Sequence, residues 1–293
     1  MLSILIPTYN YDVSSLIEHI YRQCKEADID FEILVLDDCS TQPIITENIS
    51  KSSEFKNLVV FRNETNLGRT KTRKLLADKS RYNWILFLDA DVIPIKEDFI
   101  SDYLKAIQTR YKVVLGGCLY HSFNLDFSTI FRWKYGIERE ASPVKIRTKN
   151  PYGYVLSANI LMDKQTFLEN NFNENMNLYG MDIYLSYNLF RNKIAVLHID
   201  NPVIHLGLEP NEVFFRKSLQ SVESRKKYLA DLPDIEKINS LIKHYKRLKK
   251  LGLTGLVSFI FKISEPYLRK KILNQNPNIF LFDLYRLGYI CSV

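Results

Sequence analysis

The hydrophobic positions of the first part of the chain form two alternating patterns. Short apolar runs, typical of strands buried on both faces of a sheet, lie at residues 2–6, 31–38, 57–63 and 83–91. Between these runs, residues 14–27, 68–80 and 96–111 have the spacing or composition of helices. Strands that alternate with helices of this length predict an α/β fold, with a mostly parallel central sheet flanked by helices.

The pattern changes after residue 111. Residues 112–120 (KVVLGGCLY) predict another strand, residues 154–167 predict a strand that enters a helix, and residues 194–207 predict one or two closing strands. The segment 180–193 (GMDIYLSYNLFRNK) predicts a helix with Asp182 at its start. From residue 212 onward the pattern is helical throughout.

Charge divides the chain at about residue 210. The whole chain carries 40 Lys and Arg against 33 Asp and Glu, and residues 211–293 hold 16 of the former against 7 of the latter. This asymmetry predicts two regions with different roles. We expect an α/β domain at residues 1–210 and a basic, amphipathic helical extension at residues 211–293.

Composition favours an ordinary globular protein, since 46% of the residues are hydrophobic and 25% are charged. The four cysteines are scattered, which is typical of reduced thiols in a cytoplasmic protein. The N-terminus lacks the pattern of a signal peptide, and no apolar run reaches the roughly 20 residues that span a bilayer. We therefore expect a cytoplasmic protein that does not span a membrane.

Polar clusters follow three of the predicted strands: PTYN after the first, DDCS after the second and DAD after the fourth. In an open parallel sheet these strand ends meet at one edge, where ligands bind. Asp89 and Asp91 are two residues apart, so both point to the same side of an extended segment. Their carboxylates could hold Mg²⁺ or Mn²⁺, which prefer oxygen ligands, or could simply cap the following helix.

Six segments carry a family resemblance: SILIPTYN, FEILVLDDCST, NLGRTKTRK, WILFLDAD, GMDIYLSYNL and NPVIHLG. They occur in the order and approximate spacing seen in family 2 glycosyltransferases, and the chain resembles that family over about residues 1–210. The resemblance implies a GT-A (Rossmann-like) catalytic domain. It also implies transfer of a sugar from a nucleoside-diphosphate sugar, with UDP-sugars favoured, to a hydroxyl of a glycan or lipid-linked acceptor.

The same resemblance implies a donor site. The residues that it places around the nucleotide and sugar are Pro7, Thr8, Tyr9, Asp38, Arg73, Asp89 and Ala90. Asp38 would accept a hydrogen bond from the base, and Asp91 would bind the Mn²⁺ or Mg²⁺ that bridges the diphosphate. His205 is a further candidate metal ligand, although a buried, hydrogen-bonded histidine is an equally good interpretation. Asp38 could likewise be a loop cap, and Tyr9 a packing residue.

The resemblance also identifies the catalytic base. Inverting sugar transfer needs a carboxylate that takes the proton of the acceptor hydroxyl, and Asp182 occupies that position. An ordinary helix cap is the alternative. Met181 stands where the family has Glu, a residue that contacts the acceptor. Asn159 lies at a family position near the acceptor, and an ordinary turn or strand-end hydrogen bond is the alternative for it. Processive members of the family carry a Gln-x-x-Arg-Trp element after the base. Here the Arg-Trp dipeptide, Arg132-Trp133, precedes Asp182, so the resemblance implies addition of a single sugar and not processive synthesis.

Two other functional classes are open at this point. The segment FLDADVIP also resembles the nucleophile loop of haloacid-dehalogenase-type phosphotransferases, although there the loop follows the first strand of the fold. The sequence pI near 9.0 suggests a nucleic-acid-binding protein, but a basic patch alone is weak evidence for one.

We expect no nucleic-acid partner, because the positive charge lies in the C-terminal region among apolar segments. Basic amphipathic stretches of this kind suit an anionic membrane surface, such as the inner face of the cell membrane, or pack on the catalytic domain.

Overall fold

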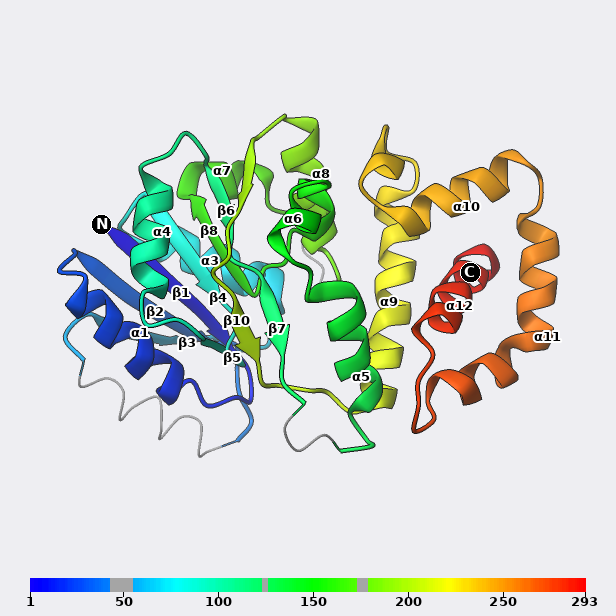
Figure 1. Ribbon diagram of the computed structural model, residues 1–293, viewed down its shortest axis with the longest axis horizontal. Helices are drawn as coiled ribbons and strands as arrows, with labels where there is room; N and C mark the ends of the chain where they lie inside the picture. Colours follow the sequence, from blue (N-terminus) through cyan, green and yellow to red (C-terminus); the bar gives the residue numbers. More distant parts are fainter. Residues whose placement is uncertain (43–54, 123–125, 173–178) are drawn as a thin grey trace. The chain divides into compact units, whose positions relative to one another are not determined.

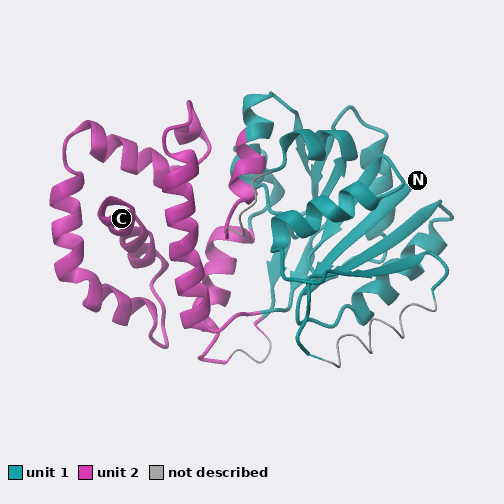
Figure 2. Ribbon diagram, turned by 180° about the vertical axis from the view of Figure 1, so that it is seen from behind, with its two compact units in different colours: residues 1–121, 142–177, 188–207 teal, residues 122–141, 178–187, 208–293 magenta. Residues whose placement is uncertain are grey.

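The computed structural model describes residues 1–42, 55–122, 126–172 and 179–293 (Figure 1). The chain folds into two compact units (Figure 2). The first unit consists of residues 1–121, 142–177 and 188–207, and the second consists of residues 122–141, 178–187 and 208–293. The second unit thus contains two segments from before residue 210, and the domain boundary expected at that residue stays a prediction.

Within the described residues, a seven-stranded sheet forms the centre of the first unit, in the order β3-β2-β1-β4-β8-β6-β9. Its strands are β1 (Leu2–Thr8), β2 (Phe31–Asp37), β3 (Leu58–Arg62), β4 (Trp84–Leu88), β6 (Val113–Leu115), β8 (Asn159–Asp163) and β9 (Val196–His198). All neighbouring strands are parallel except β8, which is antiparallel to both β4 and β6. The expected mostly parallel sheet is confirmed.

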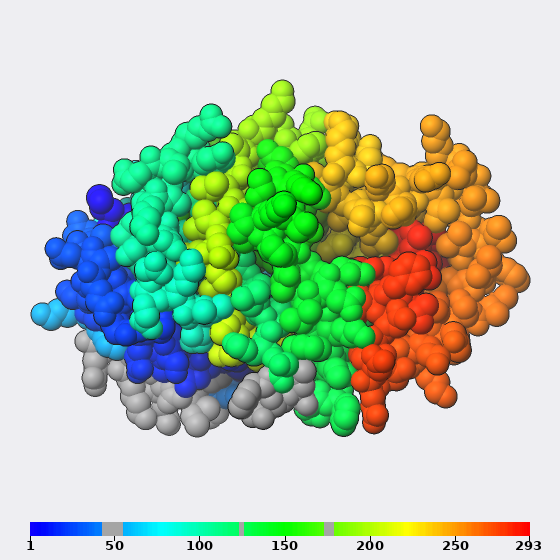
Figure 3. All heavy atoms as spheres, viewed as in Figure 1, coloured from blue at the N-terminus to red at the C-terminus, as the bar shows by residue number. Residues whose placement is uncertain are grey.

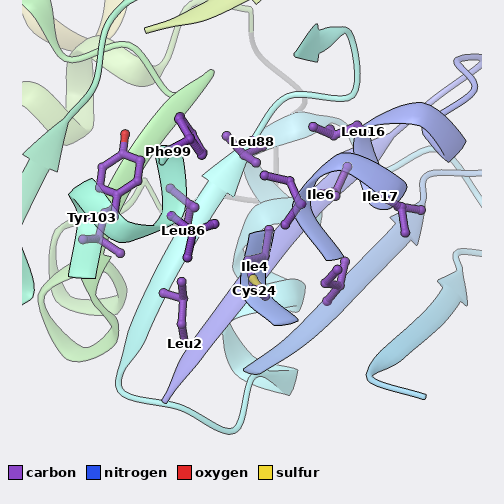
Figure 4. Packing of buried hydrophobic residues seen from close by; sticks show 14 of the residues in the cluster. Leu2, Ile4, Ile6, Leu16, Ile17, Cys24, Leu86, Leu88, Phe99 and Tyr103 are labelled. Atoms are coloured by element: carbon purple, nitrogen blue, oxygen red, sulfur yellow. The ribbon is translucent and has the colours of Figure 1, made fainter. Parts of the chain in front are cut away.

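Helices cover both faces of this sheet. They are α1 (Ser14–Glu26), α3 (Arg69–Lys79), α4 (Phe99–Ile107) and α7 (Lys164–Asn170). Alternate residues of β1 and β4, such as Ile4 and Leu86, pack against α1 and α4 (Figure 4). Phe87 points to the opposite face, where its ring centroid lies 4.7 Å from that of Phe167 on α7. Apolar residues on both faces explain the nearly unbroken hydrophobic runs in the sequence.

The segment 112–120 is two strands instead of the single strand that its apolar pattern predicts. The chain turns at Gly116 and Gly117, and Gly117 has a φ of 97°, a conformation that favours glycine. Before the turn lies β6, and after it lies β7 (Cys118–Tyr120), in a separate sheet. This three-stranded sheet, within the described residues, has the order β5-β10-β7, with β5 at Val92–Pro94 and β10 at Val203–His205.

The second unit is helical. Its elements are α5 (Ile130–Tyr135), a π-helical turn (Gly136–Glu140), the start of α8 (Asp182–Arg191), α9 (Asn211–Leu229), a 3₁₀ turn (Ile235–Lys237), α10 (Ser240–Lys250), α11 (Thr254–Ile272) and α12 (Ile279–Ser292). Its aromatic core joins α5 to the C-terminal helices, since Phe131 is fully buried against Phe214 and Phe282. The expected C-terminal helical region is therefore confirmed.

Two short helical segments complete the first unit, α6 (Val144–Arg147) and a 3₁₀ turn (Pro151–Tyr154). Across the described parts of the chain, no helix combines the length and the apolar character needed to cross a membrane.

Candidate active site

The strand ends meet at one edge of the sheet, as the sequence predicts. Thr8, the last residue of β1, pairs in register with Asp37, the last residue of β2. Leu88, the last residue of β4, pairs with Asn159, the first residue of the antiparallel β8. The polar residues that follow β1, β2 and β4 are therefore collected at the carboxyl edge of the parallel strands, where α/β proteins bind ligands.

The end of β1 is held by local hydrogen bonds. The Thr8 hydroxyl donates to the Tyr11 carbonyl at 2.8 Å, and the Thr8 carbonyl accepts from the Asp38 N–H at 2.9 Å. Pro7 is half-buried in β1, whereas the side chain of Tyr9 is 48% exposed. An exposed aromatic ring directly beyond a strand end is available to stack on a flat ligand.

Asp38 connects the end of β2 to the loop before α3. Its buried carboxylate accepts hydrogen bonds from the Asn63 amide at 2.8 Å and from the Leu67 and Gly68 N–H groups at 2.9 and 2.8 Å. Gly68 precedes α3 with a φ of 80°, which lets its N–H point at Asp38. The carboxylate thus fixes this loop, and three bonds leave room for one further donor.

Asp89 forms a charged cluster with two arginines of α3. Arg73 donates to one carboxylate oxygen of Asp89, and Arg69 donates to the other at 2.9 Å. Burial alone would raise the pKa of Asp89, but the two guanidinium groups outweigh it and lower that pKa below its ordinary value. Asp89 is therefore ionised at neutral pH. Ala90, the next residue, packs against the main hydrophobic core.

Asp91 and His205 lie together where the two sheets meet. Asp91 ends the segment between β4 and β5, its carbonyl accepts from the Leu206 N–H at 2.8 Å, and its Oδ2 lies 3.5 Å from His205 Nε2. The His205 ring stacks on Tyr120 with centroids 5.4 Å apart, and its buried Nδ1 finds no hydrogen-bond partner within the described structure. Burial raises the pKa of the Asp91 carboxyl. His205 acts to lower this pKa, whereas the negative charge of Asp89 acts to raise it.

Two neighbours of Asp91 were not identified from the sequence. A Cβ atom on Gly207 would lie 2.2 Å from Asp91 Oδ2, so only glycine leaves the carboxylate in this position. Burial raises the pKa of the Tyr11 hydroxyl, and the charge of Asp91 raises it further. The sequence offered only weak indications that these two residues belong to the site. Gly207 lies two residues after His205, and Tyr11 directly follows the PTYN cluster.

Asn159 is buried and its side chain makes three hydrogen bonds within the protein. Its carbonyl oxygen accepts from the Tyr103 hydroxyl at 2.5 Å, and its amide donates to the carbonyls of Gly117 and Asn201, both at 2.9 Å. The side chain thus ties β8 to the turn that separates the two sheets. These bonds match the strand-end alternative considered for this residue, and its contact with an acceptor stays a prediction.

Asp182 and Met181 belong to the second unit. Asp182 is the first residue of α8, and Met181 beside it is buried. Asp182 acts electrostatically on Arg225 of α9. Burial, together with the nearby charge of Arg286, lowers the pKa of the Arg225 guanidinium. Asp182 and two tyrosines act in the opposite direction but do not outweigh the burial. The Arg225 Nε is buried and has no hydrogen-bond partner within the described residues.

The donor set fits a hard divalent cation. Asp91 supplies carboxylate oxygens and His205 an imidazole nitrogen, both accepted by Mn²⁺, and their 3.5 Å separation is short enough for one ion. Within the described residues, no group of three or more His, Cys, Asp or Glu side chains could enclose a metal. Mg²⁺ bound through one or two protein side chains commonly keeps positions open for phosphate oxygens of a ligand.

The first unit thus has a mostly parallel sheet with acidic residues at its carboxyl edge, and the C-terminal region is helical, which is the architecture expected of a GT-A glycosyltransferase. Residues 3–161 match the model of Glycosyl transferase family 2, and because this is more than half of the chain, the chain belongs to that family.

Two curated relatives support the assignment. An uncharacterized glycosyltransferase of Haemophilus influenzae is 39% identical over 93 residues, which are 31% of this chain and 29% of the relative. One of Methanocaldococcus jannaschii is 28% identical over 149 residues, 50% of this chain and 45% of that protein. The matched region thus spans less than half the length of either relative.

Three solved structures share the fold. A mannosyltransferase of Pyrobaculum calidifontis, in complex with GDP-Man and Mn²⁺, has a TM-score of 0.55 at 14% identity and covers 80% of this chain and 66% of its own. S. aureus TarS 1–349, in complex with UDP-GlcNAc, has a TM-score of 0.55 at 16% identity and covers 99% and 90%. Glucosyl-3-phosphoglycerate synthase of Mycobacterium tuberculosis, with Mn²⁺, UDP and glucosyl-3-phosphoglycerate, has 0.53 at 15% and covers 78% and 79%. At these identities the likeness shows the GT-A fold alone.

Proposed function

We propose that this family 2 glycosyltransferase moves a sugar from a nucleoside-diphosphate sugar, with a UDP-sugar favoured, to a hydroxyl of a glycan or lipid-linked saccharide. The observation that carries the proposal is the Asp91–His205 pair beside the Asp89–Arg73 cluster, at the carboxyl edge of the parallel strands. Solved relatives of the same fold hold UDP, UDP-GlcNAc or GDP-Man, which supports a nucleotide-sugar donor.

Asp91 and His205 would hold Mn²⁺ or Mg²⁺, and two structural relatives contain Mn²⁺. The ion would supply positive charge to the diphosphate that leaves in the reaction. The Arg73 guanidinium, which is held in place by its ion pair with Asp89, would add to the positive charge of the ion from the protein side. Asp89 itself would contact the ribose or sugar, with Ala90 beside it.

The nucleoside would lie against the end of β1. Tyr9 would stack on the base, with Pro7 and Thr8 forming the floor below it. Asp38 would accept a hydrogen bond from the base through the lone pair that its three loop donors leave available.

Asp182 would act as the general base on the acceptor hydroxyl, with attack from the opposite face that inverts the anomeric centre. Asn159 and Met181 are the proposed acceptor contacts. One sugar would be added per encounter, because no Arg-Trp dipeptide follows Asp182 in the sequence.

The metal assignment is tested by calorimetric titration of UDP with and without Mn²⁺. Asp91→Ala should weaken UDP binding at least tenfold in Mn²⁺ and leave the weak metal-free binding unchanged. Asp78→Ala is the matched control, since Asp78 is a carboxylate paired with Lys74 on the surface of α3. Equal affinities for the Asp91→Ala and unaltered proteins in Mn²⁺ would refute the assignment.

The base assignment needs a functional donor, which thermal stabilisation by a panel of nucleotide sugars with Mn²⁺ would identify. With that donor, Asp182→Asn should abolish transfer and leave donor affinity unchanged, because the amide has the shape of the carboxylate but cannot take the proton. Measurable turnover by Asp182→Asn would exclude Asp182 as the base. Phosphate release from simple esters, in place of sugar transfer, would instead favour a phosphotransferase.

A further inference from the structure

Helix α11 is apolar on two opposite faces. Phe261 and Ile272 are buried against the core of the second unit, where Phe261 packs on Tyr285 of α12 with ring centroids 4.9 Å apart. A second set of apolar side chains points away from that core, with exposed fractions between 55% and 68%. We call this set the α11 stripe; it consists of Leu256, Phe259, Ile260, Ile263 and Tyr267.

The stripe is continuous along the helix. Its members follow one another at intervals of one, three or four residues, which places them on a single face. In Figures 1 and 3, α11 (orange) forms an outer edge of the second unit. A contiguous exposed apolar patch of this kind marks a surface that binds a partner or a membrane, and helices that are apolar all round are normally buried.

Positive charge surrounds the stripe. Lys249 and Lys250 are exposed just before it, at the end of α10. Lys270 and Lys271 are exposed just after it, three and four residues beyond Tyr267 and so on the same face. Glu265 is the only acidic residue of α11, and it lies on the opposite face, where it accepts a hydrogen bond from the Tyr285 hydroxyl at 2.7 Å.

We propose that the α11 stripe docks this protein on an anionic lipid surface. The helix would lie in the plane of the interface, with its apolar side chains among the acyl chains and its lysines beside the headgroups. Its exposed apolar side chains share one face of the helix, and an interfacial position suits this arrangement. Because the docking element is separate from the donor site, the proposal does not depend on sugar transfer.

A second copy of the chain is a poorer occupant for the same face. Residues 211–293 carry 16 Lys and Arg against 7 Asp and Glu. A two-fold contact would bring these like charges together, since each copy presents the same surface to the other. Anionic headgroups instead have the complementary charge.

Cosedimentation with lipid vesicles tests the proposal on the full chain. We expect binding to phosphatidylglycerol-containing vesicles at low salt, at least tenfold weaker binding to pure phosphatidylcholine, and a marked loss at high salt. Absence of binding to the anionic vesicles at low salt would overturn the proposal.

Variants then locate the surface. Phe259→Glu combined with Ile263→Glu should reduce vesicle binding at least tenfold, whereas Val59→Glu, at an exposed apolar residue of β3, should leave it unchanged. Lys270→Glu combined with Lys271→Glu should weaken binding and reduce its salt dependence. Unchanged binding by the α11 double variant would show that the stripe is not the docking surface.

A conservative variant keeps the test valid even if the glutamate variants fold poorly. Phe259→Trp retains an exposed aromatic ring, and brominated lipids should quench its fluorescence beyond the quenching of Trp84 and Trp133 in the unaltered protein. No additional quenching would overturn the proposal. A dimer in sedimentation velocity that Phe259→Glu dissociates would also overturn it, because a second copy would then cover the stripe.

Discussion

At the residue scale, the carboxyl edge of the parallel strands carries aspartates that lie in different environments. Asp89 is held ionised by Arg73 and Arg69, whereas burial raises the pKa of Asp91 beside it. The negative charge of Asp89 is already compensated by the two arginines. The Asp91 carboxylate, in contrast, gains most from an added cation. Two aspartates separated by one residue can therefore have different roles in one site.

Replacing Asp89 tests the structural part of that arrangement. Asp89→Asn should lower the free energy of unfolding by about 3 kcal/mol, because the largely buried Arg73 guanidinium loses the charge that compensates it. Asp78→Asn, which breaks the half-exposed pair with Lys74, should cost less than about 1 kcal/mol. Urea unfolding of both variants measures the difference, and equal losses would contradict this account of Asp89.

His198 gives the first unit a predictable pH dependence. Its buried ring lies 3.0 Å from Arg147 Nη1 and 3.0 Å from the Pro151 carbonyl, and burial, together with the charge of Arg147, lowers its pKa to about 4. A folded-state pKa below the unfolded value near 6.5 means that protonation favours unfolding. The stability contribution is complete above about pH 6.5 and is lost as the pH falls toward 4.

Unfolding in urea at pH 7 and pH 5 checks this dependence. The unaltered protein should lose on the order of 2 kcal/mol through His198 between the two pH values. His198→Gln can keep both hydrogen bonds without titrating, so its loss should be smaller by that amount. The same loss in both proteins would show that other groups cause the pH dependence.

The sequence was sufficient to place most candidate residues at one edge, because strand ends in a parallel sheet are adjacent whatever the loops do. It could not show how the loops use those residues. The Asp38 carboxylate is largely taken up by backbone N–H groups of Leu67 and Gly68, and that contact depends on a positive φ at Gly68. The effect of the Asp91 charge on the pKa of Tyr11 depends in the same way on the loop conformation after β1.

At the element scale, the main departure from the sequence pattern is the break between β6 and β7. Residues 112–120 have the apolar pattern of one strand, but they contribute to two sheets with different neighbours. Consecutive glycines at 116 and 117 were the available signal, since glycine inside a strand pattern often marks a bend or a close approach. The small sheet that results holds His205 next to Asp91.

Gly116→Ala tests how tightly that break is packed. A Cβ atom there would lie 2.2 Å from the Asn201 carbonyl oxygen and 2.6 Å from the Tyr103 hydroxyl, so the backbone must shift. We expect a loss of about 1–3 kcal/mol in the free energy of unfolding. Gly255→Ala is the control, because it lies in open space within α11 and should raise stability by at most about 1 kcal/mol. Thermal unfolding of both variants gives the comparison.

At the scale of the whole molecule, the order of the chain and the division into compact units do not coincide. The sequence suggested a boundary at residue 210 because charge and pattern change there. Yet α5, from the segment 122–141, belongs to the same unit as the C-terminal helices. This arrangement depends on contacts between distant aromatic residues, which neither local periodicity nor charge reveals. Phe131 is the clearest case, with its ring 5.3 Å from that of Phe214 and 4.9 Å from that of Phe282.

A fragment ending at residue 210 would decide whether the expected domain folds alone. Removal of α9 and α12 should expose Phe131 and Tyr135 of α5, which are covered by Phe214 and Phe282 in the full chain. We expect the fragment to melt at a lower temperature than the full chain and to self-associate as its concentration rises. Replacing Phe131 and Tyr135 by serine in the fragment should reduce the self-association. A monomeric fragment with an unchanged melting temperature would instead establish residues 1–210 as an independent domain, with the basic helices as an addition to it.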